Sequence, residues 1–177
     1  MTKVSEQIWN ERMANLRNRR ASKPGSTSSK ISGISDYYRH IRKASMIGKS
    51  VLDVGCGSCE IQNHLPKDTC YTGIDAFPVN NDVVNMQIEN CTFGDNQFET
   101  IYAFAMLDNV QDLEKALYHI KRVASKNVLF LTGVNIEPDQ FHTIKITESL
   151  LIDNMKPFKV GYMEYLHPQI MLIEFIK

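Results

Sequence analysis

The chain has 177 residues, of which 43% are hydrophobic, so it is long and apolar enough for one compact domain with its own core. No apolar run approaches the ~18–20 residues that cross a bilayer, which excludes a membrane-spanning segment. The first residues are polar, without a signal-peptide core, and the four cysteines show no disulfide framework. We therefore expect a cytoplasmic protein.

Charge is unevenly spread although the formal net charge is zero. Residues 1–50 hold 11 Lys and Arg against 3 Asp and Glu, whereas the remainder holds 9 against 17. A basic amino-terminal arm on an acidic body suggests an anionic partner or substrate. The alternative is the solvated basic face of a helix.

The amino-terminal region predicts two helices joined by a linker. Residues 5–20 show an apolar stripe at helical spacing, and residues 22–29 form a turn-rich linker. Asp36 could cap a second helix that ends near Met46. We expect residues 1–48 to form a helical cover and linker. The apolar residues assigned to the two helices are Ile8, Trp9, Met13 and Leu16, then Tyr37, Tyr38 and Ile41.

Residues 49–177 alternate between strand and helix patterns, which predicts an α/β fold with helices on both faces of a mostly parallel sheet. The expected strands are 51–55, 70–74, 83–88, 99–105, 127–132, 158–166 and 170–176. The expected helices are 59–65, 112–125 and 147–155, with Thr147 as the amino cap of the last. The turn at residues 167–169 is too short for a parallel crossover, so the last two strands should form an antiparallel hairpin.

The clearest motif is residues 51–60, Val-Leu-Asp-Val-Gly-Cys-Gly-Ser-Cys-Glu, followed by a second strand that ends at Asp75. An apolar strand, a glycine-rich turn and a distal carboxylate hold an adenosine-containing ligand at the carboxyl edge of a parallel sheet. Gly55 and Gly57 allow close backbone approach, and Asp75 can accept both ribose hydroxyls. A strand–turn–helix crossover without a ligand is the plainer alternative.

Asp53 indicates which ligand is bound, because it lies two residues before the turn. A carboxylate there would repel a pyrophosphate but attract an amino group. S-adenosylmethionine has an ammonium and a sulfonium and no phosphate, so it fits better than a dinucleotide. Cys56 and Cys59 could also be a redox or zinc pair, but no second Cys/His pair completes four metal ligands, and we expect no metal.

These residues resemble a known family. Leu52-Asp-Val-Gly-Cys-Gly-Ser-Cys59 and Gly73-Ile-Asp75 are similar to the first two motifs of class I S-adenosylmethionine-dependent methyltransferases. Phe93-Gly-Asp-Asn-Gln-Phe-Glu99 resembles the approach to the fourth strand of that family, and the segment from Ala105 to Leu117 resembles the strand end and helix that follow. The likeness begins near Lys49 and is closest to the small-molecule branch. It implies a three-layer α/β/α Rossmann-like methyltransferase fold with a seven-stranded sheet, and residues 49–177 as the S-adenosylmethionine-binding domain.

The resemblance also implies roles for individual residues. Asp53 would bind the methionine ammonium, Gly55 and Gly57 would shape the loop around the methionine moiety, and Asp75 would bind the ribose. The other residues that we expect at the cofactor are Cys56 in the same loop, Ala76 and Phe77 beside the adenine, Gln87 and Ile88 at the adenine edge, and Ala105 beside the methionine portion.

Catalytic groups are less clearly marked. Asp108-Asn109 stands where Glu-His often follows the fourth strand in this branch, so a general base would be Asp108 or a group outside this loop. His142, on the loop before the last helix, is the other candidate. A third glycine is common in the family at the position of Cys59, where the larger side chain could crowd the methionine end of the cofactor.

The leading hypothesis is an enzyme that transfers a methyl group from S-adenosylmethionine, leaving S-adenosylhomocysteine, to an oxygen or nitrogen of a small molecule or sugar. A nucleic-acid methyltransferase is a second hypothesis, supported by the basic arm. Against it, no Asp/Asn-Pro-Pro-aromatic stretch follows the fourth strand. A third is a binding or scaffold protein with this fold and no catalysis.

Overall fold

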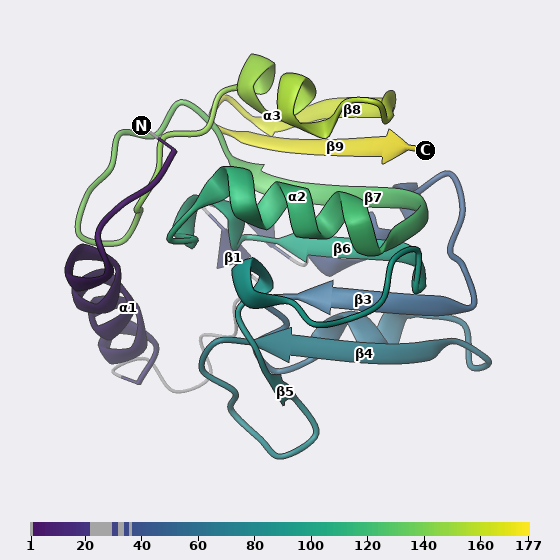
Figure 1. Ribbon diagram of the computed structural model, residues 1–177, viewed down its shortest axis with the longest axis horizontal. Helices are drawn as coiled ribbons and strands as arrows, with labels where there is room; N and C mark the ends of the chain where they lie inside the picture. Colours follow the sequence, from purple (N-terminus) through teal and green to yellow (C-terminus); the bar gives the residue numbers. More distant parts are fainter. Residues whose placement is uncertain (1, 22–29, 32–33, 36) are drawn as a thin grey trace.

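The computed structural model describes residues 2–21, 30–31, 34–35 and 37–177. Seven strands form one sheet in the order β5-β4-β3-β6-β7-β9-β8 (Figure 1). Their bounds are β3 (Ser50–Val54), β4 (Cys70–Asp75), β5 (Val84–Asn85), β6 (Phe98–Phe104), β7 (Ala124–Gly133), β8 (Lys159–His167) and β9 (Ile170–Ile176). A separate two-stranded pair joins β1 (Lys30–Ile31) to β2 (Ile34–Ser35).

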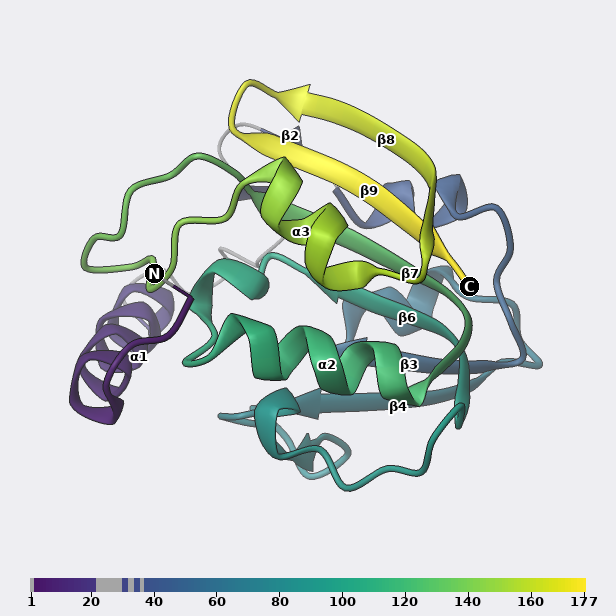
Figure 2. The same ribbon diagram turned by 45° about the horizontal axis from the view of Figure 1, so that its top comes forward.

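The direction of the strands confirms the expected sheet. Neighbours from β5 to β7 are parallel, whereas β9 is antiparallel to both β7 and β8. The hairpin of β8 and β9 therefore lies at one edge of the sheet, where β8 is the outermost strand (Figure 2).

The described helices are α1 (Glu6–Ala21), α2 (Leu113–Val123) and α3 (Glu148–Met155), with four 3₁₀ helices. These are η1 (Tyr37–Lys43), η2 (Glu60–His64), η3 (Ile88–Asn90) and η4 (Leu107–Asn109). Helices α2 and α3 cover one face of the sheet (Figure 2), and η1 and η2 pack against the other. Helix α2 lies within the expected 112–125, and the Asp112 side chain caps it by accepting from the Lys115 amide. Thr147 caps α3 in the same way, as expected.

Three expected elements differ from the structure. The helices expected at 36–46 and 59–65 are 3₁₀ helices of seven and five residues, and the strand expected at 83–88 is only two residues long. Asp36, expected as a cap, lies outside the described residues. The short 3₁₀ form of η2 follows from its surroundings, because Cys59 enters it with a left-handed backbone and β4 begins at Cys70. Polar residues Asn80, Asn81 and Asp82 precede the short edge strand β5.

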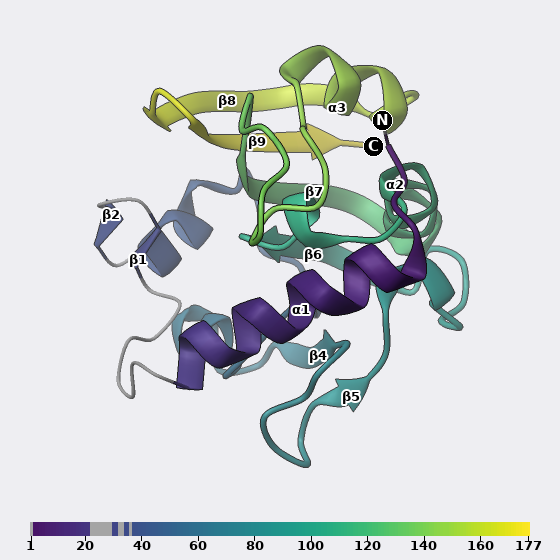
Figure 3. The same cartoon turned by 90° about the vertical axis from the view of Figure 1, so that its left-hand side faces the viewer.

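Helix α1 lies across the carboxyl ends of the parallel strands, away from the two layers that cover the sheet (Figure 3). Its apolar side is narrower than the pattern predicts, because Trp9 and Met13 are buried whereas Ile8 is 41% exposed. Trp9 and Met13 form a small cluster with Val4, separate from the two clusters on the sheet faces. Backbone hydrogen bonds from Val4 to Gln111 and from Leu113 to Thr2 attach its leading segment to the start of α2.

None of the described helices is both long enough and apolar enough to cross a membrane.

Candidate functional site

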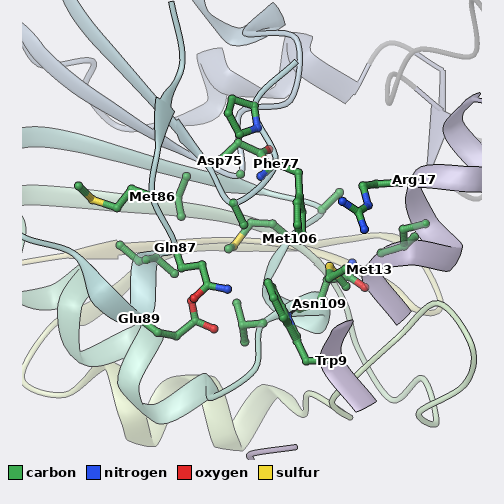
Figure 4. A pocket seen from close by; sticks show the side chains of 18 of the residues that line it. Trp9, Met13, Arg17, Asp75, Phe77, Met86, Gln87, Glu89, Met106 and Asn109 are labelled. Carbon is green, nitrogen blue, oxygen red and sulfur yellow. Dashed lines mark hydrogen bonds between the residues drawn. The ribbon is translucent and has the colours of Figure 1, made fainter. Parts of the chain in front are cut away.

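A cavity of about 500 Å³ lies between α1 and the carboxyl ends of β3, β4 and β6 (Figure 4). Most of its wall is apolar, and the charged side chains on it are Arg17, Asp75 and Glu89. The remaining residues on the wall are Trp9, Met13, Leu16, Val54, Gly55, Ala76, Phe77, Pro78, Val79, Met86, Gln87, Ile88, Ala105, Met106, Asn109 and Val110. Such a position, at the strand ends of an open α/β sheet, is where ligands bind in this architecture.

The glycine turn after β3 begins at Gly55, which lies on the cavity wall. Gly55 and Gly57 have φ values of 70° and 53°, which a residue with a side chain adopts only at a cost. A Cβ on Gly55 would lie 2.7 Å from the Cβ of Met106, whereas a Cβ on Gly57 would have no atom within 4 Å. Gly55 is therefore required for packing, while open space beside Gly57 lets a ligand approach the backbone.

Asp75 ends β4 and holds the glycine turn in place. Its Oδ2 accepts a hydrogen bond from the Gly57 amide at 3.0 Å, and its Oδ1 accepts one from the Phe77 amide at 2.8 Å. Each carboxylate oxygen has two acceptor sites, so both oxygens can still accept a hydroxyl from a ligand. The position and chemistry fit a ribose diol.

Helix α1 supplies the wall opposite the strand ends. The Trp9 ring stacks on Phe77 with centroids 5.6 Å apart, and its Nε1–H donates to the carbonyl oxygen of Asn109 at 2.9 Å. The Arg17 guanidinium lies over Phe77, 4.3 Å from the ring centroid. Phe77 is therefore in contact with two side chains of α1 on the wall of the cavity (Figure 4).

Gln87 and Glu89 stand on the side of the cavity away from Arg17 (Figure 4). The Gln87 Oε1 accepts from the Asn90 side-chain amide at 3.0 Å. Glu89 is 6% exposed, and its Oε1 accepts from the Gln111 amide at 2.8 Å. The second oxygen of Glu89 has no hydrogen-bond partner among the described residues, so Glu89 as well as Gln87 offers an acceptor to a ligand.

The end of β6 forms the inner wall. Ala105 has φ 54°, an uncommon conformation for alanine, and its amide donates to the Leu131 carbonyl oxygen at 2.7 Å. Asn109, four residues later, lines the cavity, and its Oδ1 is buried with no hydrogen-bond partner among the described residues. A strained backbone and an unsatisfied acceptor on one wall are typical of a ligand site.

Asp53 does not line the cavity. It lies on the face of β3 that also carries Val51, is 2% exposed, and its Oδ2 accepts from the Tyr71 hydroxyl at 2.7 Å. Burial raises the pKa of Asp53 to about 7, and Asp75 adds to this, while the Tyr71 hydrogen bond lowers it. A cation beside Asp53 would compensate for the buried charge.

Cys56 and Cys59 also lie outside the cavity wall. Their Sγ atoms are 3.5 Å apart, and both cysteines are free thiols. Burial, with the nearby Asp53 carboxylate, raises the pKa of Cys56 well above its ordinary value, so this thiol is a poor metal ligand at neutral pH. The described part of the chain contains no group of three or more His, Cys, Asp or Glu side chains placed to hold a metal.

The two candidate catalytic residues come together although they are far apart in the chain. His142 Nε2 lies 3.7 Å from Asp108 Oδ2, and its Nδ1 lies 2.8 Å from Asp139 Oδ1. Burial raises the pKa of Asp108, and the neighbouring His142 opposes this shift. Neither residue lines the cavity, although Asp108 directly precedes Asn109, which does.

The structure therefore brings most of the expected cofactor residues to one cavity: Gly55, Asp75, Ala76, Phe77, Gln87, Ile88 and Ala105. Asp53, Cys56 and Gly57 are adjacent in the chain but are not on its wall. The sequence reasoning assigned no cavity role to Trp9, Met13, Arg17, Glu89, Met106 or Asn109. The apolar stripe and the expected amino-terminal cover contained a signal for Trp9 and Met13, but not for the individual residues that they would contact.

Comparisons with known proteins agree with this geometry. A family model described as a methyltransferase domain matches residues 10–150. No curated protein matches the sequence. The solved structures with a similar fold include a 1,6-didemethyltoxoflavin-N1-methyltransferase from Burkholderia thailandensis, at TM-score 0.70 and 13% identity, covering 98% of this chain and 91% of that one.

Two further solved structures have a fold similar to that of this chain. The [4+2]-cyclase SpnF has a TM-score of 0.69 at 15% identity, and the match covers 100% of this chain and 97% of that one. A methyltransferase dependent on S-adenosylmethionine from Aquifex aeolicus has a TM-score of 0.60 at 16% identity, covering 79% and 89%. The matched segment runs from α1 into α3 and includes the glycine turn, Asp75 and the end of β6. The chain belongs to the methyltransferase domain family, the class I enzymes that use S-adenosylmethionine.

Proposed function

We propose that this enzyme transfers the methyl group of S-adenosylmethionine to an oxygen or nitrogen atom of a small molecule. The observation that carries the proposal is the enclosure of the cavity by α1. Trp9 connects the helix to Phe77 on one wall and to Asn109 on another, and the walls are mostly apolar. A small, largely apolar acceptor fits such a space better than a polymer does.

The cavity fits the methyl donor at several points. Asp75 would accept the ribose hydroxyls, the open space at Gly57 would admit the methionine portion, and Glu89 or Gln87 would accept from the adenine amino group. Asp53, beneath the turn, would attract the ammonium group, through the loop or a water molecule. The similar Burkholderia thailandensis enzyme, solved with a small heterocyclic compound and S-adenosylhomocysteine, supports a small-molecule acceptor.

S-adenosylmethionine supplies an already activated methyl group on its sulfonium. The protein therefore contributes mainly by aligning the acceptor and excluding water, which α1 and the apolar wall would do. An acceptor that loses a proton also needs a base. His142 is our candidate for that role, with Asp108 beside it, because Asp108 directly precedes Asn109, which lines the cavity.

A transfer assay with a radiolabelled methyl donor tests the proposal. We expect label to enter low-molecular-weight fractions of a cell extract, and not added RNA or DNA. Label in nucleic acid that falls steeply with salt would favour the second hypothesis instead. Absence of both transfer and donor binding would favour a scaffold protein.

Asp75→Asn tests the ribose assignment through the affinity for the donor. We expect donor affinity to fall by about 10- to 100-fold, the cost of one hydrogen-bonded charge, as measured by calorimetric titration. Asp82→Asn makes the same charge change at an exposed position outside the cavity wall and should bind the donor normally. Equal affinities for the two variants would contradict the ribose assignment.

A further inference from the structure

The loop between β7 and α3 contains a carboxylate and an imidazole in a fixed arrangement. Asp139 Oδ1 accepts hydrogen bonds from the backbone amides of Phe141 at 2.7 Å and His142 at 2.8 Å. The same oxygen lies 2.8 Å from His142 Nδ1, and the Asp139 amide donates to the His142 carbonyl oxygen at 3.0 Å. One tight turn thus holds both side chains.

The protonation state of Asp139 decides which nitrogen of His142 carries hydrogen. Partial burial acts to raise the pKa of Asp139, but the two backbone hydrogen bonds and the imidazole outweigh it, so the pKa lies below its ordinary value. An ionised carboxylate only accepts hydrogen bonds. His142 Nδ1 must therefore donate, and in the neutral ring the lone pair is on Nε2.

The turn is attached to the inner end of the cavity. The Thr143 hydroxyl donates to the carbonyl oxygens of Asp108 at 2.9 Å and Val110 at 2.7 Å. Arg12 of α1 donates to the Thr143 carbonyl oxygen at 3.0 Å. These bonds place His142 Nε2 3.7 Å from Asp108 Oδ2, too far for a direct hydrogen bond, and a third polar atom could contact both.

We propose that Asp139 is a positioning residue, which holds His142 as the Nδ1–H tautomer and so leaves the Nε2 lone pair, beside Asp108, free to accept a proton. This rests on the proposed function, in which His142 is the base. As the acceptor atom bonds to the methyl carbon and the carbon–sulfur bond breaks, the acceptor's proton moves to Nε2. The resulting imidazolium keeps its Nδ1–H bond to Asp139, whose negative charge stabilises it.

Nuclear magnetic resonance of ¹⁵N-histidine-labelled protein tests the tautomer without donor or acceptor. Two-bond ¹H–¹⁵N correlations distinguish Nδ1–H from Nε2–H, and the spectrum of His142→Gln identifies the signals of His142 among the five histidines. We expect Nδ1–H in the wild type. Asp139→Asn would keep an acceptor oxygen at this place, whereas Asp139→Ala removes the acceptor of Nδ1–H, so in Asp139→Ala we expect the proton to move to Nε2. Asp153→Asn, which removes an equal charge from an exposed pair on α3, should leave the tautomer unchanged.

Two outcomes would overturn the proposal: an Nε2–H tautomer in the wild type, or an unchanged Nδ1–H tautomer in Asp139→Ala. Once the transfer assay has identified an acceptor, Asp139→Ala should lower kcat by about 10-fold or more, within the range of general-base catalysis, and leave the KM for the donor nearly unchanged. Full activity of His142→Gln would overturn the catalytic part. Because the tautomer needs no methyl transfer, its result is separate from any failure of the proposed function.

Discussion

Asp53 couples the stability of the fold to pH. Its pKa is raised by burial from an ordinary 3.8 to about 7, so the native chain retains a proton that the unfolded chain has already lost. The free energy of unfolding is therefore highest below about pH 4, where Asp53 is protonated in both states. It falls as pH rises to about 7, because deprotonation favours the unfolded chain. A shift of this size corresponds to a loss of at most about 4 kcal/mol.

We expect Asp53→Asn to remove this loss. The variant should be more stable than the wild type at pH 8 by roughly 1 kcal/mol or more, and the difference should vanish near pH 4. Urea unfolding at several pH values measures it. Tyr71→Phe is the companion variant, since losing the Tyr71 hydrogen bond should raise the pKa of Asp53 further and strengthen the pH dependence. Parallel curves for wild type and Asp53→Asn would contradict the titration of this group.

The two glycines of the turn should respond differently to alanine. Gly55→Ala places a Cβ against Met106 at a left-handed φ, and we expect it to cost about 3 kcal/mol or more in unfolding free energy. The added methyl group of Gly57→Ala has no atom within 4 Å, so we expect the unfolding free energy to fall by about 1 kcal/mol, from the left-handed φ alone. Donor affinity should nevertheless fall in folded Gly57→Ala, because the methyl group occupies the ligand's space. Normal affinity in that variant would contradict the position of the methionine portion.

At the level of elements, local pattern predicted the parts whose neighbours are near in sequence. The position of α2, the Thr147 cap and the β8–β9 hairpin depend on local spacing and turn length, and all three were predicted correctly. The 3₁₀ form of η2 could not be read from spacing, because it depends on the left-handed backbone at Cys59 and on the start of β4 at Cys70. The distances between Trp9 and Phe77, and between His142 and Asp108, depend on tertiary packing between distant segments.

The side-chain alternation of β3 explains why Asp53 is not on the cavity wall. Residues 51 and 53 point to one face of the sheet and residues 52 and 54 to the other. Val51 belongs to the apolar cluster under η1 and η2, and Val54 reaches the cavity wall. The sequence placed Asp53 next to the turn correctly, but the side on which it lies depends on the orientation of the strand.

Helix α1 should affect ligand retention more than global stability. Its buried residues form a small cluster apart from the sheet, and Trp9 Nε1 makes one hydrogen bond to Asn109. Trp9→Phe keeps a ring against Phe77 and loses that bond, worth about 1 kcal/mol. We expect the donor to dissociate about fivefold faster, measured by stopped-flow fluorescence or competition. Ile8→Ala, at an exposed position of the same helix, should leave the rate of donor dissociation unchanged. An increase equal to that in Trp9→Phe would contradict a specific role of Trp9.

Across the whole molecule, the protection of backbone amides from hydrogen exchange should decrease from the centre of the sheet to the cavity wall. Strands β6, β7 and β9 are buried and paired on both sides, whereas β5 is a two-residue edge strand and α1 packs through few side chains. Local opening is cheapest where buried apolar contacts are few. We expect amide hydrogen exchange to be slowest in β6, β7 and β9 and fastest in β5 and α1.

Donor binding should then change exchange selectively. Ligand that contacts Asp75, Phe77 and Trp9 joins the two least stable regions, so amides of α1 and of residues 75–87 should slow most, with α3 nearly unchanged. The measurement compares amide exchange of the wild type with and without saturating donor. Asp75→Asn at the same donor concentration is the control, and its exchange should slow little. A uniform slowing over all elements would mean that the donor stabilises the fold globally and that α1 does not close on it.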